Sequence, residues 1–127
     1  MSNVVDFRNI EKETLRNADY RRVVYTKRGE VQVVLMCLNP GENIPREKHD
    51  DGVQFMRVER GDGVVRVASS RRHRVTDGSA ITITSGVYHY VANTSKTKPL
   101  KLYIVYCPPQ HAARNLTQRR QPPPPRK

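Results

Sequence analysis

The sequence lacks tryptophan altogether, and aromatic residues make up only 6% of it. The few tyrosines and phenylalanines are not interleaved with the basic runs, so the chain lacks the stacking platforms with which proteins hold single-stranded nucleic acid. It also lacks an amphipathic helix that could enter a DNA groove. Direct nucleic-acid recognition is therefore the least supported class of function.

Long apolar runs are absent as well. No run exceeds about six residues, whereas a membrane-spanning helix needs about twenty. Residues 1–5 contain no apolar core of a secretory signal. We therefore expect a soluble protein with no membrane association and a cytoplasmic location, with the virion as the alternative location.

Cysteine is scarce. Cys37 and Cys107 each lie inside or at the end of an apolar, strand-like run. We expect both to behave as small buried hydrophobic residues rather than to form a disulfide. A reduced compartment is the corresponding expectation.

Acidic residues are few and unevenly placed. The 12 acidic residues face 23 basic ones, which gives a net charge of +11. Six of the acidic residues lie between positions 42 and 62, whereas the basic excess falls in residues 21–28, 66–74 and 114–127. Such a surface favours non-specific contact with polyanions. The alternative is that the arginines and lysines simply form a solvated basic face.

Short β-rich segments dominate the rest of the chain. About eight of them follow one another, separated by turn signals every eight to twelve residues or so, which is typical of an all-β sandwich or closed barrel. A chain of 127 residues suits one such domain. We expect an N-terminal arm at residues 1–19 with a short helical turn near residues 14–18, a barrel at 20–112 and a tail at 113–127.

The tail is basic and rich in proline. Its last nine residues are Arg119-Arg120-Gln121, four prolines from Pro122 to Pro125, and Arg126-Lys127. We expect an extended polyproline-type segment that has no core to join. The pattern R-x-x-P-x-x-P is compatible with docking on an aromatic groove, a phosphate-binding tail is a second possibility, and an inert or assembly-tethering tail is a third.

Two polar clusters, at residues 47–54 and 78–93, stand out between the strand-like segments. Because strand side chains alternate, Glu47 and His49 point to the same side. The Asp50-Asp51-Gly52 break can shift the register by one residue and return Gln54 to that side. His89 lies on one face of the second cluster's strand. We expect the two clusters to face one another inside the barrel.

The spacing of these residues resembles the cupin superfamily over residues 20–112. The second cupin half-motif is matched at Gly78, Gly86, His89 and Asn93, with Thr84 in place of its proline. In the first half-motif His49 matches the second histidine, Gln54 stands for the glutamate and Gly61 matches the glycine. Glu47 occupies the place of the first histidine.

The resemblance implies a single antiparallel β-barrel, also described as a double-stranded β-helix or jelly roll. It also implies a divalent metal site, commonly holding iron, manganese, nickel or zinc, with Glu47, His49, Gln54 and His89 as the ligands. These side chains offer two imidazole nitrogens, a carboxylate and an amide, a set suited to borderline metals. The alternative is a structural role, because an isolated histidine in a β protein is more often hydrogen-bonded than metal-bound.

Two functions remain open at this stage. In one, the metal site binds or converts a small oxygenated molecule, sugar-like or carbonyl-containing, which Tyr88, Tyr90, Tyr103 or Tyr106 orients. Glu47 and Asp51 are the only nearby candidates for a general base, and Glu47 cannot be both base and ligand. The sequence therefore assigns no catalytic residue and does not decide whether the protein is an enzyme. In the other, a non-catalytic cupin serves as a structural component of a virion or nucleoprotein complex. A homodimer is plausible in either case, because cupin barrels often pair edge to edge.

Overall fold

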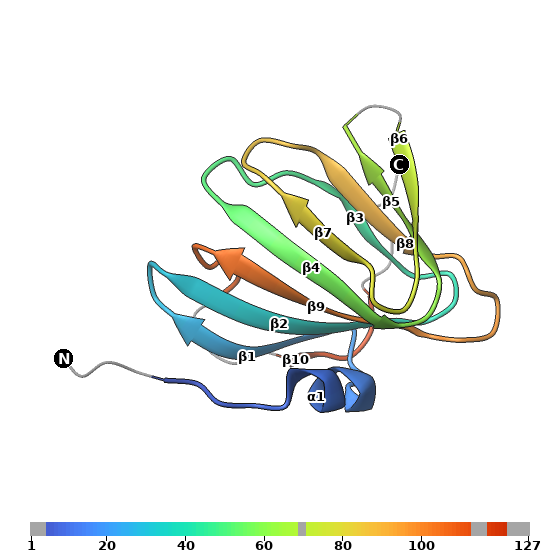
Figure 1. Cartoon of the computed structure of the whole chain (residues 1–127), viewed down its shortest axis with the longest axis horizontal. Coiled ribbons are helices and arrows are strands. Elements are labelled where there is room, and N and C mark those ends of the chain that lie inside the picture. The colour runs from blue at the N-terminus through green and yellow to red at the C-terminus, as the bar shows by residue number, and fades with distance from the viewer. Residues whose placement is uncertain (1–4, 69–70, 113–116, 122–127) are drawn as a thin grey trace.

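A computed structural model describes residues 5–68, 71–112 and 117–121 of the chain (Figure 1). These residues form one short helix and ten strands in two antiparallel sheets. The elements are α1 (Ile10–Arg16), β1 (Arg21–Lys27), β2 (Val31–Leu38), β3 (Asn43–Glu47), β4 (Val53–Arg60), β5 (Gly63–Val67), β6 (Arg71–Val75), β7 (Ala80–Ile83), β8 (His89–Asn93), β9 (Leu100–Cys107) and β10 (Thr117–Gln118). The all-β prediction is confirmed.

The two sheets face each other and enclose the core. The larger sheet has the order β10-β1-β2-β9-β4-β7, and the smaller has the order β3-β8-β5-β6. Apart from the hairpins β1–β2 and β5–β6, neighbouring strands in each sheet are far apart in sequence, as in a jelly roll. The buried cluster between the sheets consists of Tyr20, Val23, Val34, Met36, Leu38, Ile44, Met56, Val58, Val65, Val75, Val91, Leu100, Leu102, Ile104 and Tyr106.

Strand β2 is buried on both faces along its second half, as its apolar run predicts. Val34 and Met36 belong to the core cluster between the sheets. Leu35 and Cys37 are also buried, although they point the other way. Helix α1 packs on β2, β4 and β9 and helps to cover this outer face.

Helix α1 begins earlier than the sequence prediction of a turn near residues 14–18. The side chain of Asn9 accepts a hydrogen bond from the backbone N–H of Lys12 at 3.0 Å and so caps the first turn. The helix therefore occupies residues 10–16. Asparagine is a strong N-cap residue, so Asn9 marks the start of this helix in the sequence.

The small sheet ends in the basic strand β6, as expected for a charged edge strand. Residues 71–74, including His73, are exposed there. Residues 69–70, just before β6, lie outside the described part of the chain.

Asn93, the last residue of β8, has a structural role, because its side chain donates hydrogen bonds to the carbonyl groups of Leu38 and Lys98, each at 2.9 Å.

The two cysteines differ in environment. Both are free, and Cys37 is buried as predicted, but Cys107 is exposed. The prediction for Cys107 was wrong because burial alternates along β9, and its final residue falls on the outward side.

Part of the tail packs on the barrel. Strand β10 pairs with β1 in an antiparallel register. The backbone N–H of Tyr20 donates to the carbonyl group of Arg119 at 3.2 Å, and the side chain of Gln121 accepts a hydrogen bond from the backbone N–H of Asn43 at 2.8 Å. The expectation that the tail has no core to join is therefore wrong for residues 117–121. Backbone pairing does not depend on apolar side chains, so composition gave no sign of it.

The remaining predicted tail, residues 113–116 and 122–127, lies outside the described residues, as do residues 1–4 of the arm. The proline-rich pattern is among them. Within the residues that are described, α1 is far too short to cross a bilayer, and no helix there qualifies as a membrane span.

Candidate metal centre

The loop after β3 and the loop before β8 meet at one end of the barrel (Figure 1). The backbone N–H of Gly86 donates to the carbonyl group of His49 at 2.8 Å. The hydroxyl group of Ser85 donates to the carbonyl group of Gly52 at 3.0 Å. The two polar clusters predicted to face one another are therefore joined by direct hydrogen bonds.

Glu47, His49 and His89 converge inside this end of the barrel. Each offers one ligand atom, and these atoms all lie within 4.8 Å of one another. A carboxylate oxygen of Glu47 lies 3.2 Å from Nε2 of His49 and 3.6 Å from Nε2 of His89. Glu47 and His89 are also cross-strand partners in the ladder between β3 and β8, so the sheet itself sets their approach.

Gln54 joins the group from the opposite sheet. Its side-chain nitrogen lies 3.1 Å from Nε2 of His89, and both residues are buried. Gln54, Met56 and Val58 are all buried on β4, as the predicted register shift requires. The four residues proposed from sequence therefore lie together, three within ligand distance of one another and the fourth beside His89.

The imidazole of His89 has a defined orientation. Its Nδ1 lies 3.0 Å from the carbonyl oxygen of Val87, a group that can only accept a hydrogen bond. Nδ1 therefore carries the proton of the neutral ring, so the lone pair of Nε2 is directed into the site, where it accepts a hydrogen bond from the side-chain nitrogen of Gln54 at 3.1 Å. Metal-binding histidines in proteins commonly have this arrangement.

The carboxyl group of Glu47 is ionised in this setting. Burial by itself raises its pKa, but the neighbouring imidazoles of His89 and His49 outweigh burial, so the pKa is lowered overall. A carboxylate, two imidazoles and an amide form a donor set suited to a divalent transition ion.

The spacing of the donor atoms fits such an ion. Nitrogen and oxygen ligands at 2.0–2.2 Å from one metal lie about 3 to 4 Å from each other, and the Glu47 contacts of 3.2 and 3.6 Å fall in this range. Gln54 completes the set once its amide turns by half a rotation and presents Oε1 in place of the nitrogen. The residues present therefore fit a divalent metal.

Of the four tyrosines expected to orient a ligand, only Tyr106 faces the site. Its ring centroid lies 5.6 Å from that of His49, in an edge-to-face arrangement. Burial raises the pKa of Tyr106 well above its usual range, so the phenol stays protonated and can donate a hydrogen bond. Tyr88 is exposed beneath the guanidinium group of Arg46, and Tyr90 and Tyr103 alternate outward on β8 and β9.

The predicted role of Asp51 as a base near the metal is not supported. Asp51 is exposed, and its carboxylate accepts a hydrogen bond from the side chain of Gln110 at 3.4 Å. The turn at residues 50–52 directs it away from the barrel interior. Glu47 is therefore the carboxylate that the described residues bring into the site.

His111 is a residue of this end of the barrel that sequence reasoning missed. Its ring centroid lies 5.3 Å from that of Tyr106, and its Nε2 is buried with no hydrogen-bond partner among the described residues. Burial lowers the pKa of His111 to about 4. Buried Gln32 holds the segment in place, because its side chain accepts hydrogen bonds from the backbone N–H groups of Gln110 and His111 at 3.2 and 3.0 Å. The sequence hint for this contact is Gln32 itself, a polar residue within the apolar run of β2 that needs hydrogen-bond partners.

Comparison with known proteins agrees with this geometry. A family model described as "Cupin domain" matches residues 34–106. The uncharacterized protein L612 of Acanthamoeba polyphaga mimivirus is 39% identical over 88% of this chain and 71% of its own length. The uncharacterized protein YrkC of Bacillus subtilis is 42% identical over 81% of this chain, which spans 57% of that relative's length.

A solved structure extends the agreement to three dimensions. The crystal structure of BH2720 from Bacillus halodurans has 38% sequence identity and a TM-score of 0.84, and the match covers 91% of this chain and 89% of that one. The predicted barrel and the predicted family are both confirmed. The chain belongs to the cupin family.

Proposed function

We propose that this cupin binds one divalent transition metal ion, iron, manganese, nickel or zinc, through Glu47, His49, Gln54 and His89. The bound site then binds or converts a small oxygenated molecule, sugar-like or carbonyl-containing. The observation that carries the proposal is the placement of the Glu47 carboxylate 3.2 Å from one imidazole nitrogen and 3.6 Å from another. The hydrogen bond that directs Nε2 of His89 inward supports it.

Such a metal supplies Lewis-acid chemistry at a ligand oxygen when it is bound. The protein side chains divide the remaining work. Glu47 offsets part of the positive charge of the metal ion. Because its carboxylate is a ligand, it does not also serve as a base. Tyr106, held protonated by burial, donates a hydrogen bond to an oxygen of the ligand. His111, neutral at pH 7, offers a second hydrogen-bonding group from the loop after β9.

Elemental analysis combined with thermal unfolding tests the metal. We expect about one transition metal ion per chain, and a melting temperature about 10 °C higher at a metal concentration 100 times the dissociation constant. His89→Ala abolishes both effects, whereas His73→Ala, a matched change on the exposed strand β6, preserves them. Absence of metal, with no effect of His89→Ala on stability, would remove the basis of the proposal.

The second candidate is a non-catalytic cupin that serves as a structural component of an assembly, including a virion. It is supported by the viral relative at 39% identity and by the basic surface, which is suited to polyanions. A homodimer is compatible with both candidates, so an assembly larger than a dimer is the distinguishing feature. Sedimentation velocity tests it: a metal-free species larger than a dimer supports the structural role, and a metal-bound monomer or dimer contradicts it.

A further inference from the structure

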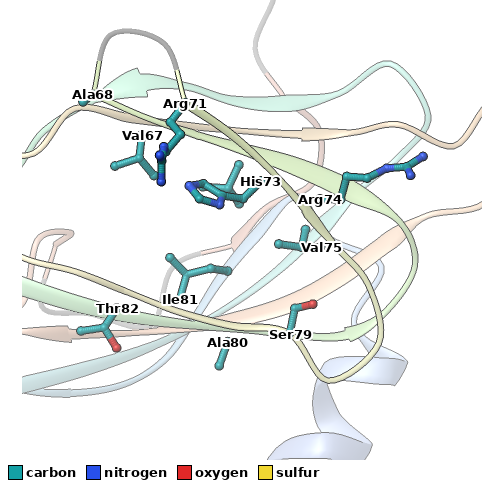
Figure 2. A pocket seen from close by; sticks show the side chains of 11 residues that line it. Val67, Ala68, Arg71, His73, Arg74, Val75, Ser79, Ala80, Ile81 and Thr82 are labelled. Carbon is teal, nitrogen blue, oxygen red and sulfur yellow. The ribbon is translucent and has the colours of Figure 1, made fainter.

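The barrel has a second concave region, separate from the metal centre. Strand β7 ends the larger sheet and β6 ends the smaller one, and the two strands are not paired with each other. A cavity of about 560 Å³ lies between them (Figure 2). Small-molecule sites in proteins have volumes of about 300 to 1,000 Å³, so this space is large enough for a small ligand.

The inner walls of this cavity are apolar. Val65 and Val75, from the β5–β6 hairpin, belong to the buried core, and Val67 and Ile81 pack against that core from opposite sheets. These walls offer few hydrogen-bonding groups, so they suit a hydrocarbon body better than a polyhydroxylated one.

The mouth of the cavity is basic. Arg71 pairs with Val67 across the β5–β6 ladder, and His73 pairs with Val65, so each shares a face with an inward-directed valine. Figure 2 shows the Arg71 and His73 side chains directed into the space between the strands, while the guanidinium group of Arg74 extends away from it.

No acidic side chain balances this charge. The lining contains no aspartate or glutamate, and none of the ion pairs among the described residues involves Arg71. A guanidinium group at an apolar opening recognises a carboxylate well, because it can donate two parallel hydrogen bonds.

The cavity also lies beside the metal centre. Glu47, His89, Val67 and Arg71 form one continuous row of cross-strand partners through the smaller sheet. Arg71 is thus two strands from His89, a separation of about 10 Å. A molecule in the cavity is held on one side of the metal centre, with Val67 between them.

We propose that the cavity between β6 and β7 binds a small organic acid with an apolar body, whose carboxylate pairs with Arg71. The valines and Ile81 enclose the apolar body, and His73 lies beside the carboxylate at the mouth. This proposal goes beyond the metal centre, because no contact in it requires a metal.

Amide chemical shifts of the full-length, chelator-treated protein test the proposal, with benzoate as the probe and benzamide as its uncharged analogue. We expect benzoate to perturb the signals of Val65, Val67 and Ile81 and to bind at least about tenfold more tightly than benzamide, as the loss of one charge-assisted contact implies. Arg71→Gln weakens benzoate binding by a similar factor and leaves benzamide binding unchanged.

Arg72→Gln is the matched control, because Arg72 is the next residue on the same exposed strand and is not part of the lining. It should leave benzoate binding unchanged. Equal losses in the two variants would reveal non-specific charge attraction and overturn the proposal, as would equal binding of benzamide. Shifts of the same signals on raising the protein concentration alone would assign the surface to self-association and also overturn it. Because the chelator removes any bound metal, benzoate binding is measured independently of the proposed metal centre.

Discussion

Among the four proposed ligands, Gln54 is the one least typical of a strong metal site. A neutral amide oxygen attracts a divalent cation less than a carboxylate does. Its neighbours are favourable, since Gln54 is buried and lies 3.1 Å from Nε2 of His89. We therefore expect the amide of Gln54 to limit the metal affinity of the proposed site.

Replacing this amide tests its role directly. We expect Gln54→Glu to raise the affinity for a divalent transition metal about tenfold or more, because it adds a second negative ligand. Gln54→Leu lowers the affinity. Competition titration with a chromophoric chelator measures both. Equal affinities for all three proteins would show that residue 54 is not a ligand.

His111 gives a second prediction, which concerns pH. Its pKa is lowered from the ordinary 6.5 to about 4 in the folded protein. As pH falls from 6.5 to about 4, the unfolded chain binds a proton at this residue that the folded chain does not, so the free energy of unfolding falls. Above pH 6.5 this contribution is fully present.

His111→Phe keeps a ring against Tyr106 and removes the titration. Urea unfolding from pH 7 to pH 4.5 should show a smaller loss of stability in the variant than in the parent protein. Parallel curves would contradict the assignment of this pH dependence to His111.

The sequence predicts the positions of the proposed ligands better than those of the residues around them. Strand alternation and motif spacing placed His49, Gln54 and His89 on inward faces, because each lies on or directly beside a regular strand. Tyr106 was one of four tyrosines expected to orient a ligand. Selecting it requires knowing which residues of β9 point into the barrel. His111 lies beyond the last barrel strand and is positioned by Gln32, about eighty residues earlier, a contact that no local pattern reveals.

At the level of elements, the turn between β4 and β5 depends on Gly61. The residue has φ +113°, and a Cβ atom added there would lie 2.6 Å from the carbonyl oxygen of Pro99. Gly78 also has a positive φ, +88°, but a Cβ atom there meets nothing within 4 Å. A side chain at Gly78 therefore meets backbone strain alone, whereas a side chain at Gly61 meets both backbone strain and a steric clash.

Paired substitutions use this difference. Gly78→Ala should cost about 1 to 2 kcal/mol, the ordinary cost of a left-handed conformation with a side chain. Gly61→Ala should cost at least about 2 kcal/mol more, since a backbone carbonyl group must also move. Equilibrium urea unfolding measures both values. Equal losses would show that the chain around Pro99 adjusts freely.

Strands were the elements that the sequence predicted best, because alternation and turn residues are local signals. The short β-rich segments expected from the sequence form strands, among them β2, β6 and β8. Helix α1 begins four residues before the predicted turn, because Asn9 caps its first turn. Strand β10 was missed because its pairing with β1 depends on backbone geometry that only the folded barrel provides.

At the level of the whole molecule, the net charge of +11 predicts association with polyanions. We expect duplex DNA of any sequence to bind weakly, and the affinity to fall at least tenfold or so between 50 and 200 mM salt. Fluorescence anisotropy with two unrelated duplexes measures this. A clear preference for one sequence, or affinity that is insensitive to salt, would contradict purely electrostatic binding.

The proposed function depends on one metal ion shared by Glu47 and the imidazoles of His49 and His89. X-ray diffraction from crystals grown with manganese or zinc, recorded on both sides of the metal absorption edge, tests it most directly. We expect one anomalous peak in contact with Glu47, His49 and His89. A difference map without a peak there, in crystals that contain the metal elsewhere, would contradict it.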